Sequence, residues 1–171
     1  MSSRDIPIGS ARQPMWPAPV VGSITHSQNF AAAVALVECS CVGIYVERVV
    51  LPELQQALLA AAISTDEHAY LRTLVVDLPF DQLITAVFSA KESFFKAAFP
   101  FVGRYFDFSA AEVVGFDSKN QYLSLMLRQD LCPELFVGKV VRVYLDFIRP
   151  DTLLTSFTNS ALDRTRPLSS G

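Results

Sequence analysis

The sequence contains no apolar run long enough to cross a membrane. Its longest uninterrupted apolar runs, residues 30–37 and 57–63, have eight and seven residues, whereas a membrane-spanning helix needs about 20. The first ten residues, MSSRDIPIGS, also lack the apolar core of a signal peptide. The sequence therefore predicts neither a membrane span nor export.

Cysteine is scarce. The chain has three cysteines, and the only close pair, Cys39 and Cys41, is separated by a single residue. This spacing suits neither a disulfide framework nor a zinc site. We therefore expect a cytoplasmic location, where thiols stay reduced.

An excess of positive charge is also missing. Fourteen basic and seventeen acidic residues give a net charge of −3, and no basic run occurs. Nucleic-acid binding is therefore not expected. In contrast, 51% of the residues are hydrophobic and 18% are charged, which is enough apolar material for a packed domain.

Periodicity divides the chain into strands, then helices, then strands. Pro52 suits the first residue of a helix, and Pro100 is expected to end a later one. The expected strands are residues 20–25, 30–37, 42–49, 112–116, 121–127, 139–148 and 152–157, and the expected helices are 52–63, 65–76 and 80–99. Because strands and helices do not alternate, the sequence predicts an α+β fold in which a mainly antiparallel sheet packs against helices.

Composition indicates three segments. Residues 1–19 carry four of the ten prolines and show little periodicity, so they are expected to form an extended lead-in. Residues 20–158 are expected to form the folded domain. The polar residues 159–171 are expected to form a flexible tail.

Two motifs fall on expected strands. VGSITHS (21–27) places His26 at a strand end, where a structural role is the ordinary interpretation. In GIYVE (43–47), Tyr45 and Glu47 lie on the same face of the strand because side chains alternate. A glutamate in such a place is normally a solvated edge charge.

The third motif, FSAKESFFK (88–96), falls on an expected helix. Glu92 and Lys96 are four residues apart and therefore lie on one face. The ordinary interpretation is an ion pair that stabilises the helix. The functional alternative is joint binding of a metal ion and a phosphate, because Mg²⁺ prefers few carboxylates plus phosphate oxygens.

In order and approximate spacing, these motifs resemble those of the 4′-phosphopantetheinyl transferases. The closest resemblance is to the enterobactin synthase component D type, within the surfactin-synthetase-activating class. Further matching blocks are RQPMWP (12–17), STDEHAYL (64–71) and YFDFSAAEVVGFD (105–117). The resemblance covers roughly residues 8 to 158, and it implies a fold that is largely the second of the family's two similar halves.

The resemblance implies an activity. Enzymes of this family bind coenzyme A with Mg²⁺ and transfer its phosphopantetheinyl arm to a serine of an apo-acyl or apo-peptidyl carrier protein, as in siderophore and other nonribosomal peptide synthesis. Adenosine 3′,5′-bisphosphate is the by-product. Two alternatives stay open: a non-catalytic relative that binds coenzyme A or a carrier protein, and an incomplete product with an exposed half-interface.

The resemblance also assigns the contacts with coenzyme A. Arg12 and Pro14, in the RQPMWP block of the lead-in, match residues that hold the adenine and 3′-phosphate end. His26 matches a phosphate contact. Lys96 matches a lysine that contacts the pyrophosphate and takes part in catalysis.

Metal-binding and catalytic carboxylates follow from the same resemblance. Glu47 and Glu92 match two of the metal ligands, and Glu92 can also help to deprotonate the carrier serine. Glu67 falls near a further acidic residue of the catalytic site. Tyr45 departs from the family pattern, because it stands where a third ligand is an aspartate. A phenol with a pKa near 10 replaces that carboxylate poorly.

Length is the second departure. Enzymes of this type carry about a further third of chain before the RQPMWP block, and that part packs against the second half. We therefore expect an uncovered apolar surface and self-association. A basic patch of Lys91, Arg104 and Lys119 is the expected contact for acidic carrier proteins.

Overall fold

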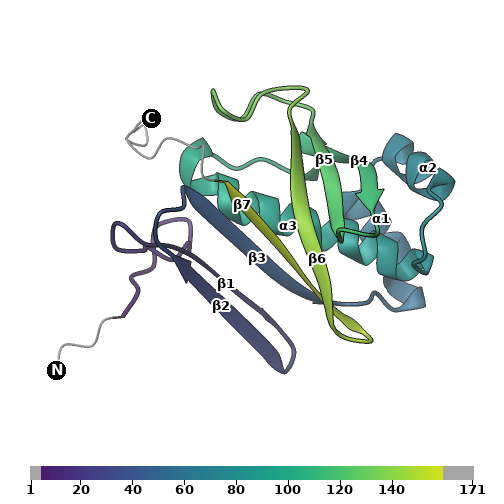
Figure 1. Cartoon of the computed structure of the whole chain (residues 1–171), viewed down its shortest axis with the longest axis horizontal. Helices are drawn as coiled ribbons and strands as arrows, with labels where there is room; N and C mark the ends of the chain where they lie inside the picture. Colours follow the sequence, from purple (N-terminus) through teal and green to yellow (C-terminus); the bar gives the residue numbers. More distant parts are fainter. Residues whose placement is uncertain (1–4, 160–171) are drawn as a thin grey trace.

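The computed structural model describes residues 5–159, whose elements are shown in Figure 1. Within these residues the strands and helices follow the predicted order. The strands are β1 (Val21–Ser27), β2 (Phe30–Leu36), β3 (Cys41–Arg48), β4 (Ala111–Asp117), β5 (Tyr122–Leu127), β6 (Val140–Arg149) and β7 (Thr152–Asn159). The helices are α1 (Gln55–Ala62), α2 (Thr65–Thr73) and α3 (Phe80–Val102), with 3₁₀ turns at Pro52–Leu54 and Phe108–Ala110.

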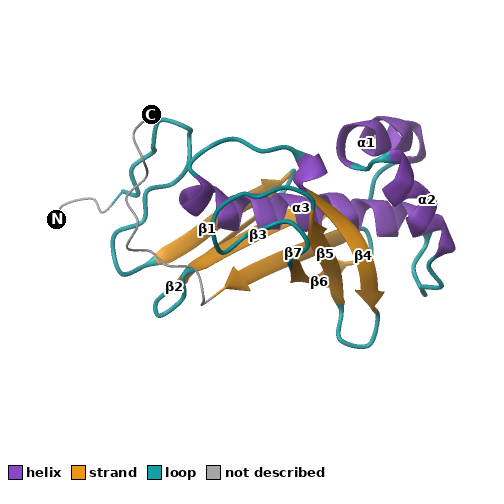
Figure 2. Ribbon diagram, turned by 90° about the horizontal axis from the view of Figure 1, so that it is seen from above, coloured by secondary structure: helices purple, strands orange, loops and turns teal. Residues whose placement is uncertain are grey.

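The strands form two antiparallel sheets. One is the hairpin β1–β2, and the other has five strands in the order β3-β7-β6-β5-β4. Figure 2 shows α3 lying along one face of the larger sheet, with α1 and α2 at the end near β4. The predicted α+β fold with a mainly antiparallel sheet is confirmed.

The hydrophobic core lies between α3 and the larger sheet. Small side chains on α3, including Ala86, Ala90 and Ala97, are almost fully buried and allow the helix to approach the strands closely. Phe94 fills the space beside them and contacts the ring of Phe157 edge to face, with 5.5 Å between ring centroids. The long helix is therefore the central support of the fold.

The sequence predicted that the helix ends before Pro100. This prediction is wrong, because α3 continues to Val102. A proline so close to the end of a helix removes only one backbone hydrogen bond, and Phe101 and Val102 pack against the core. The helix ends at Gly103, whose φ of 67° is left-handed and whose N–H donates to the Phe99 carbonyl at 2.9 Å.

Other boundaries differ by a few residues. α2 ends at Thr73 instead of residue 76, and the segment expected to begin as a helix at Pro52 begins with a 3₁₀ turn. β7 extends to Asn159, and residues 160–171 of the expected tail lie outside the described residues.

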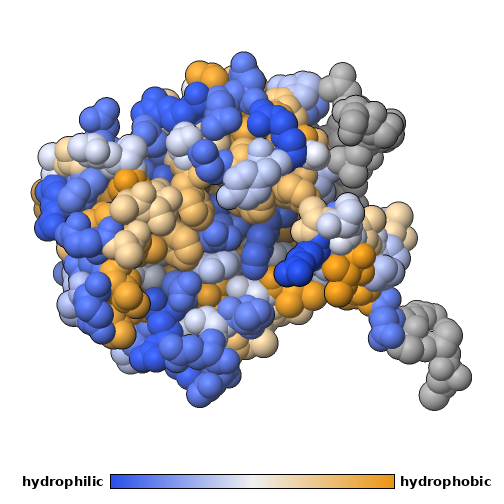
Figure 3. All heavy atoms as spheres, turned by 180° about the vertical axis from the view of Figure 1, so that it is seen from behind, coloured by the Kyte–Doolittle hydropathy of each residue, from blue (hydrophilic) through white to orange (hydrophobic). Residues whose placement is uncertain are grey.

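Some apolar side chains remain exposed, as the hydropathy view of one face in Figure 3 illustrates. The lead-in and hairpin contribute Ile8, Met15, Ile24 and Val37, which are 45–77% exposed. The self-association expected from the sequence stays a prediction. None of the helices within residues 5–159 is long and apolar enough to cross a membrane.

Gly43 generates the first testable prediction. A Cβ atom at this position would overlap the carbonyl oxygen of Ser93 on α3. We expect Gly43→Ala to lower the free energy of unfolding by about 1–3 kcal/mol or more, because the packed helix has no room to move. Gly115→Ala is the control, since its Cβ would lie 3.7 Å from the Ser124 side chain, an ordinary contact. Equal midpoints for the two variants in urea denaturation would contradict this interpretation.

Candidate active site

Strand β3 and helix α3 bring four predicted site residues together. Alternation along β3 places Tyr45 and Glu47 on one face, and one turn of α3 separates Glu92 from Lys96. The Lys96 ammonium lies 4.8 Å from the centre of the Tyr45 ring. All four side chains are partly buried, so their charges interact through a medium less polar than water.

The pKa values of the cluster reflect this proximity. Burial raises the pKa of Tyr45, and the negative charges of Glu47 and Glu92, together with a hydrogen bond to Glu47, raise it further. Burial also raises the pKa of Glu92, with the Lys96 charge opposing and the Glu47 charge adding to the shift. The pKa of Lys96 is lowered by burial, although the Glu92 charge opposes this.

Lys96 is held by backbone oxygens as well as by the Tyr45 ring. Its Nζ atom donates to the carbonyl of Ile24 on β1 at 2.9 Å and to that of Ile44 on β3 at 3.3 Å. An ammonium has three N–H donors. These two bonds therefore leave one donor for a further acceptor.

Glu47 and Glu92 are the residues that fit a metal ion. Burial is the main cause of the raised pKa of Glu92, and the like charge of Glu47 adds to it. A cation between the two carboxylates would relieve this repulsion. Mg²⁺ is commonly held by one or two carboxylates plus substrate phosphates. Tyr45 adds little, because a phenol whose pKa is raised stays neutral. Within residues 5–159 no group of three His, Cys, Asp or Glu side chains is arranged to hold a metal.

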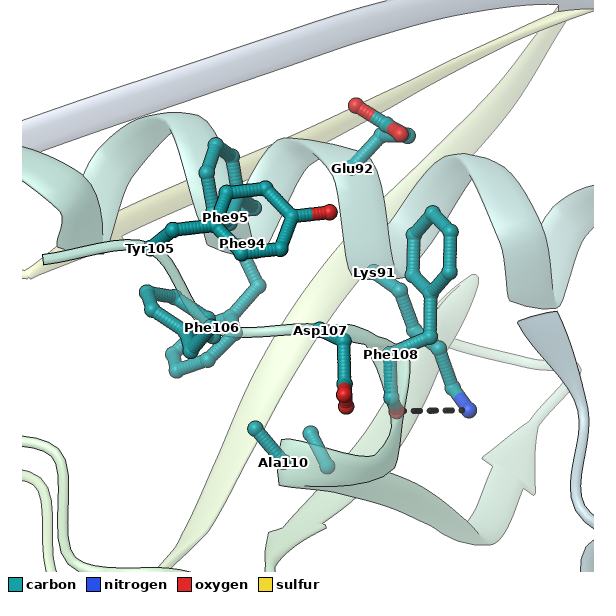
Figure 4. Close-up of a pocket in the computed structure, with 10 residues that line it drawn as sticks. Lys91, Glu92, Phe94, Phe95, Tyr105, Phe106, Asp107, Phe108 and Ala110 are labelled. Carbon is teal, nitrogen blue, oxygen red and sulfur yellow. Dashed lines mark hydrogen bonds between the residues drawn. The ribbon is translucent and has the colours of Figure 1, made fainter. Parts of the chain in front are cut away.

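Glu67 lies apart from this cluster, in a buried ion pair with Lys91. The Lys91 Nζ and Glu67 Oε2 atoms are 2.6 Å apart, and the two side chains are 3% and 0% exposed. Lys91 also donates to the carbonyl of Ala62 at 2.8 Å and to that of Phe108 at 3.3 Å, the bond drawn in Figure 4. The other oxygen of Glu67 accepts from the N–H of Val113 at 2.7 Å.

This arrangement changes the expected role of Lys91. The predicted basic surface patch with Arg104 and Lys119 is wrong for Lys91, because this side chain is buried. Both carboxylate oxygens of Glu67 are also engaged. The assignment of Glu67 to the catalytic site stays a prediction.

The residues expected to contact the rest of coenzyme A lie outside the cluster. Arg12 is exposed in the lead-in and has a left-handed backbone conformation, with a φ of 62°. Pro14 forms an isolated antiparallel β-bridge with Ile8. His26 is exposed near the end of β1, opposite Ala31 of β2. Their contacts with coenzyme A stay predictions.

A pocket lies next to Glu92, between α3 and the segment that follows it (Figure 4). Its lining is mostly aromatic: Phe94, Phe95, Tyr105, Phe106 and Phe108, with Lys91, Glu92 and Asp107 as the charged residues. Figure 4 shows Glu92 and Lys91 leaving α3 in different directions. The block 105–117 resembles the family, but no role was predicted for these aromatic residues. The signal in the sequence was their clustering, at positions 94 and 95 on α3 and at 105, 106 and 108 after it.

Fold and cluster together define an α+β protein in which the edge strand β3 and the long helix α3 bring two carboxylates and an ammonium together. Comparison with known families gives the class. The family model of the 4′-phosphopantetheinyl transferase superfamily matches residues 41–146, and that of the 4′-phosphopantetheinyl transferase N-terminal domain matches residues 1–36. The chain belongs to the 4′-phosphopantetheinyl transferase superfamily. The two matches meet between β2 and β3, where one sheet gives way to the other.

Individual relatives are similar over part of their length. Enterobactin synthase component D of Escherichia coli (strain K12) is 40% identical over 91 residues, which are 53% of this chain and 42% of that protein. The Salmonella typhi protein of the same name is 37% identical over 90 residues, 53% of this chain and 37% of the relative. The 4′-phosphopantetheinyl transferase Svp of Streptomyces mobaraensis is 34% identical over 108 residues, which are 61% of this chain and 43% of that protein. This chain thus spans less than half of the length of these relatives.

The buried ion pair generates a stability prediction. Lys91→Met leaves the Glu67 carboxylate buried without its partner, and we expect it to cost about 3–5 kcal/mol of unfolding free energy. Adding Glu67→Gln should recover most of this loss, because the neutral amide oxygen still accepts from the Val113 N–H. Urea denaturation of the three proteins measures both steps. A double variant no more stable than Lys91→Met would contradict the interpretation.

The coupled carboxylates generate a titration prediction. Because the pKa of Glu92 is raised, this group takes up its proton at a higher pH than an ordinary glutamate as the pH falls. Glu47→Gln removes the neighbouring like charge, so the pKa of Glu92 should fall. Carbon-detected NMR of the Glu92 carboxylate measures the midpoint, with exposed Glu53→Gln as the control. An unchanged midpoint in Glu47→Gln would place Glu47 too far from Glu92 to share a cation.

Proposed function

We propose that this chain transfers the 4′-phosphopantetheine arm of coenzyme A to a serine of an apo-acyl or apo-peptidyl carrier protein. The cluster of Glu47, Glu92 and Lys96 on β3 and α3 is the observation that carries the proposal. It combines a pair of carboxylates suited to a divalent cation with an ammonium suited to phosphate. Family membership supports the same class of reaction.

In this reaction the serine hydroxyl attacks the phosphorus atom that bears the pantetheine. The bond from that phosphorus to the bridging oxygen breaks, and adenosine 3′,5′-bisphosphate leaves with the electron pair. Lys96 faces the negative charge that develops on the leaving phosphate through its remaining N–H. An ammonium held in advance by two carbonyls needs little rearrangement to do so, which lowers the barrier.

Glu92 is the proposed general base that removes the serine proton, directly or through a water molecule. Burial and the Glu47 charge raise its pKa, and this makes the carboxylate a stronger base than an exposed glutamate. The same side chain borders the aromatic pocket. The aromatic part of that lining suits the pantetheine arm, while Arg12, Pro14 and His26 are proposed for the nucleotide end.

Mg²⁺ is the proposed cofactor, held by Glu47 and Glu92 together with phosphate oxygens of the substrate. When bound, it neutralises charge on the pyrophosphate. Tyr45 is the unusual member of this site, because its neutral phenol stands beside both carboxylates. We propose that the tyrosine weakens magnesium binding, so that the dependence of activity on magnesium is weak or shifted to high concentration.

The proposal extends to the biological setting. The relatives named enterobactin synthase component D support a carrier protein of siderophore or other nonribosomal peptide synthesis as the partner. Cys39, Cys41 and Cys132 are not joined in disulfides, which supports the cytoplasmic location expected from the sequence, where thiols stay reduced.

A second candidate function is binding of coenzyme A or a carrier protein without efficient transfer. Tyr45 favours it, because a bulky neutral ring lies where a third metal ligand would complete the site. The contacts of Lys96 do not depend on that ligand. The two candidates differ in whether labelled pantetheine appears on the carrier serine.

The experiment is a transfer assay with labelled coenzyme A and an apo-carrier protein at increasing magnesium concentration. We expect low activity that needs high magnesium in the unmodified chain. Tyr45→Asp supplies a third carboxylate, so it should tighten metal binding and raise the rate. Each version is tested with and without an amino-terminal segment grafted from a full-length relative, and Tyr144→Asp, at a half-exposed position on β6, is the control.

Two outcomes would contradict the argument. Efficient turnover of the unmodified chain at low millimolar magnesium would show that two carboxylates suffice. No gain from Tyr45→Asp, even in the grafted chain, would show that position 45 does not face the metal. Binding of coenzyme A with no transfer by any version would favour the second candidate.

A further inference from the structure

The hairpin β1–β2 is attached to the larger sheet by side chains instead of a backbone ladder. β1 lies beside the edge strand β3, yet the two belong to different sheets. The N–H of Ile44 donates to Ser23 Oγ at 3.1 Å, and the N–H of Val46 donates to Thr25 Oγ1 at 3.0 Å. Both hydroxyl-bearing residues are buried, at 4% and 2% exposure.

The spacing of these residues explains the attachment. Every second N–H of a strand points to the same edge, and every second side chain points to the same face. Ser23 bonds to Ile44, and two residues later on both strands Thr25 bonds to Val46. The residue numbers rise together, so β1 runs in the same direction as β3. The hydroxyls thereby satisfy N–H groups on the edge of the sheet that would otherwise be unpaired.

Lys96 makes the third connection. Its ammonium donates to the Ile24 carbonyl of β1 and to the Ile44 carbonyl of β3. Ile44 therefore has its N–H satisfied by β1 and its carbonyl by α3. Ile24 lies between the two hydroxyl-bearing residues, so the three connections form one continuous contact, which we call the hairpin clasp (Ser23, Ile24, Thr25 and Lys96).

We propose that docking of the hairpin and binding of a phosphate at Lys96 stabilise each other. This inference rests on the proposed function, in which Lys96 contacts the pyrophosphate of coenzyme A. The docked hairpin supplies the Ile24 carbonyl, which orients the ammonium and directs its remaining N–H. When the hairpin separates from β3, Lys96 loses its shorter hydrogen bond, and its flexible side chain must be ordered by the ligand alone.

Such coupling is reciprocal. If hairpin docking tightens phosphate binding by some factor, bound phosphate must tighten docking by the same factor. Couplings between two sites are typically about 5–150-fold in affinity. The hairpin is then a positioning element for the site, held by the hydroxyls of Ser23 and Thr25, which accept hydrogen bonds from β3.

Amide hydrogen exchange without ligand tests the attachment. The amides of Ile44 and Val46 face the hairpin, whereas those of Tyr45 and Glu47 face β7, so alternate amides on β3 provide an internal control. Lys96→Met should speed exchange at Ile44 and Val46 only. Unchanged exchange at these two amides would overturn the role of Lys96 in the clasp.

Binding of inorganic pyrophosphate, measured by calorimetry with magnesium chloride present, tests the coupling. Ser23→Ala combined with Thr25→Val loosens the hairpin but leaves the ammonium intact, and it should weaken affinity at least about 5-fold. Thr73→Val, which removes a hydroxyl bond at the end of α2, is the matched control and should leave the affinity unchanged. Gln28→Ala is a milder second variant, because it removes only the bond from Arg48 near the hairpin turn.

The outcomes are separable from those of the transferase assay. Pyrophosphate should slow exchange at Ile44 and Val46 in the wild type and not in Lys96→Met. Faster exchange in the Ser23 and Thr25 variant with unchanged affinity would overturn the coupling, as would a wild type that binds no pyrophosphate. A wild type that shows the coupling but transfers nothing would overturn the proposed function alone.

Discussion

The contact between β3 and α3 at Gly43 is the constraint on which the site depends. Because no Cβ fits between this residue and the Ser93 carbonyl, the strand and the helix lie at nearly the closest separation that their backbones allow. Alternation on the strand and one helical turn then place Tyr45 and Glu47 opposite Glu92 and Lys96. A wider separation would expose these four groups to water, which would weaken their mutual electrostatic effects.

The same helix organises its two sides differently. On one side Lys96 and Glu92 are partly buried, with unused hydrogen-bonding capacity and perturbed pKa values. On the other side, the Lys91 ammonium donates to one carboxylate and two carbonyls, so it has no N–H donor left for a ligand. The adjacent residues Lys91 and Glu92 thus have different surroundings: Lys91 belongs to a structural ion pair with Glu67, and Glu92 lies on the side of Lys96. The two lysines differ in whether all of their N–H donors are hydrogen-bonded: those of Lys91 are, and Lys96 has one left.

Sequence reasoning predicted the order of strands and helices because periods of two and 3.6 residues are local properties. It also paired Glu92 with Lys96, since four-residue spacing on a helix is local too. It was wrong about Lys91, whose surroundings come from Glu67, Ala62 and Phe108, all more than 15 residues away in the chain. The end of α3 was misplaced for a similar reason. Packing of Phe101 and Val102 against the core, which proline rules do not include, extends the helix past Pro100.

Tyr45 shows how one substitution alters a site without dismantling it. Its ring packs against Phe88, with 5.7 Å between centroids, and lies beneath the Lys96 ammonium, so it contributes apolar contact and a cation–π interaction where an aspartate would contribute charge. Burial, and then the charges of Glu47 and Glu92, raise the pKa of Tyr45, which keeps the phenol neutral and therefore a hydrogen-bond donor. Its hydrogen bond with Glu47 stabilises that carboxylate, but a neutral phenol brings no positive charge to the site. In the proposed function, weaker magnesium binding leaves more of the positive charge at the phosphate to Lys96. For this reason the elements that hold the ammonium, β1 among them, matter more for the proposed function than they would with a third carboxylate.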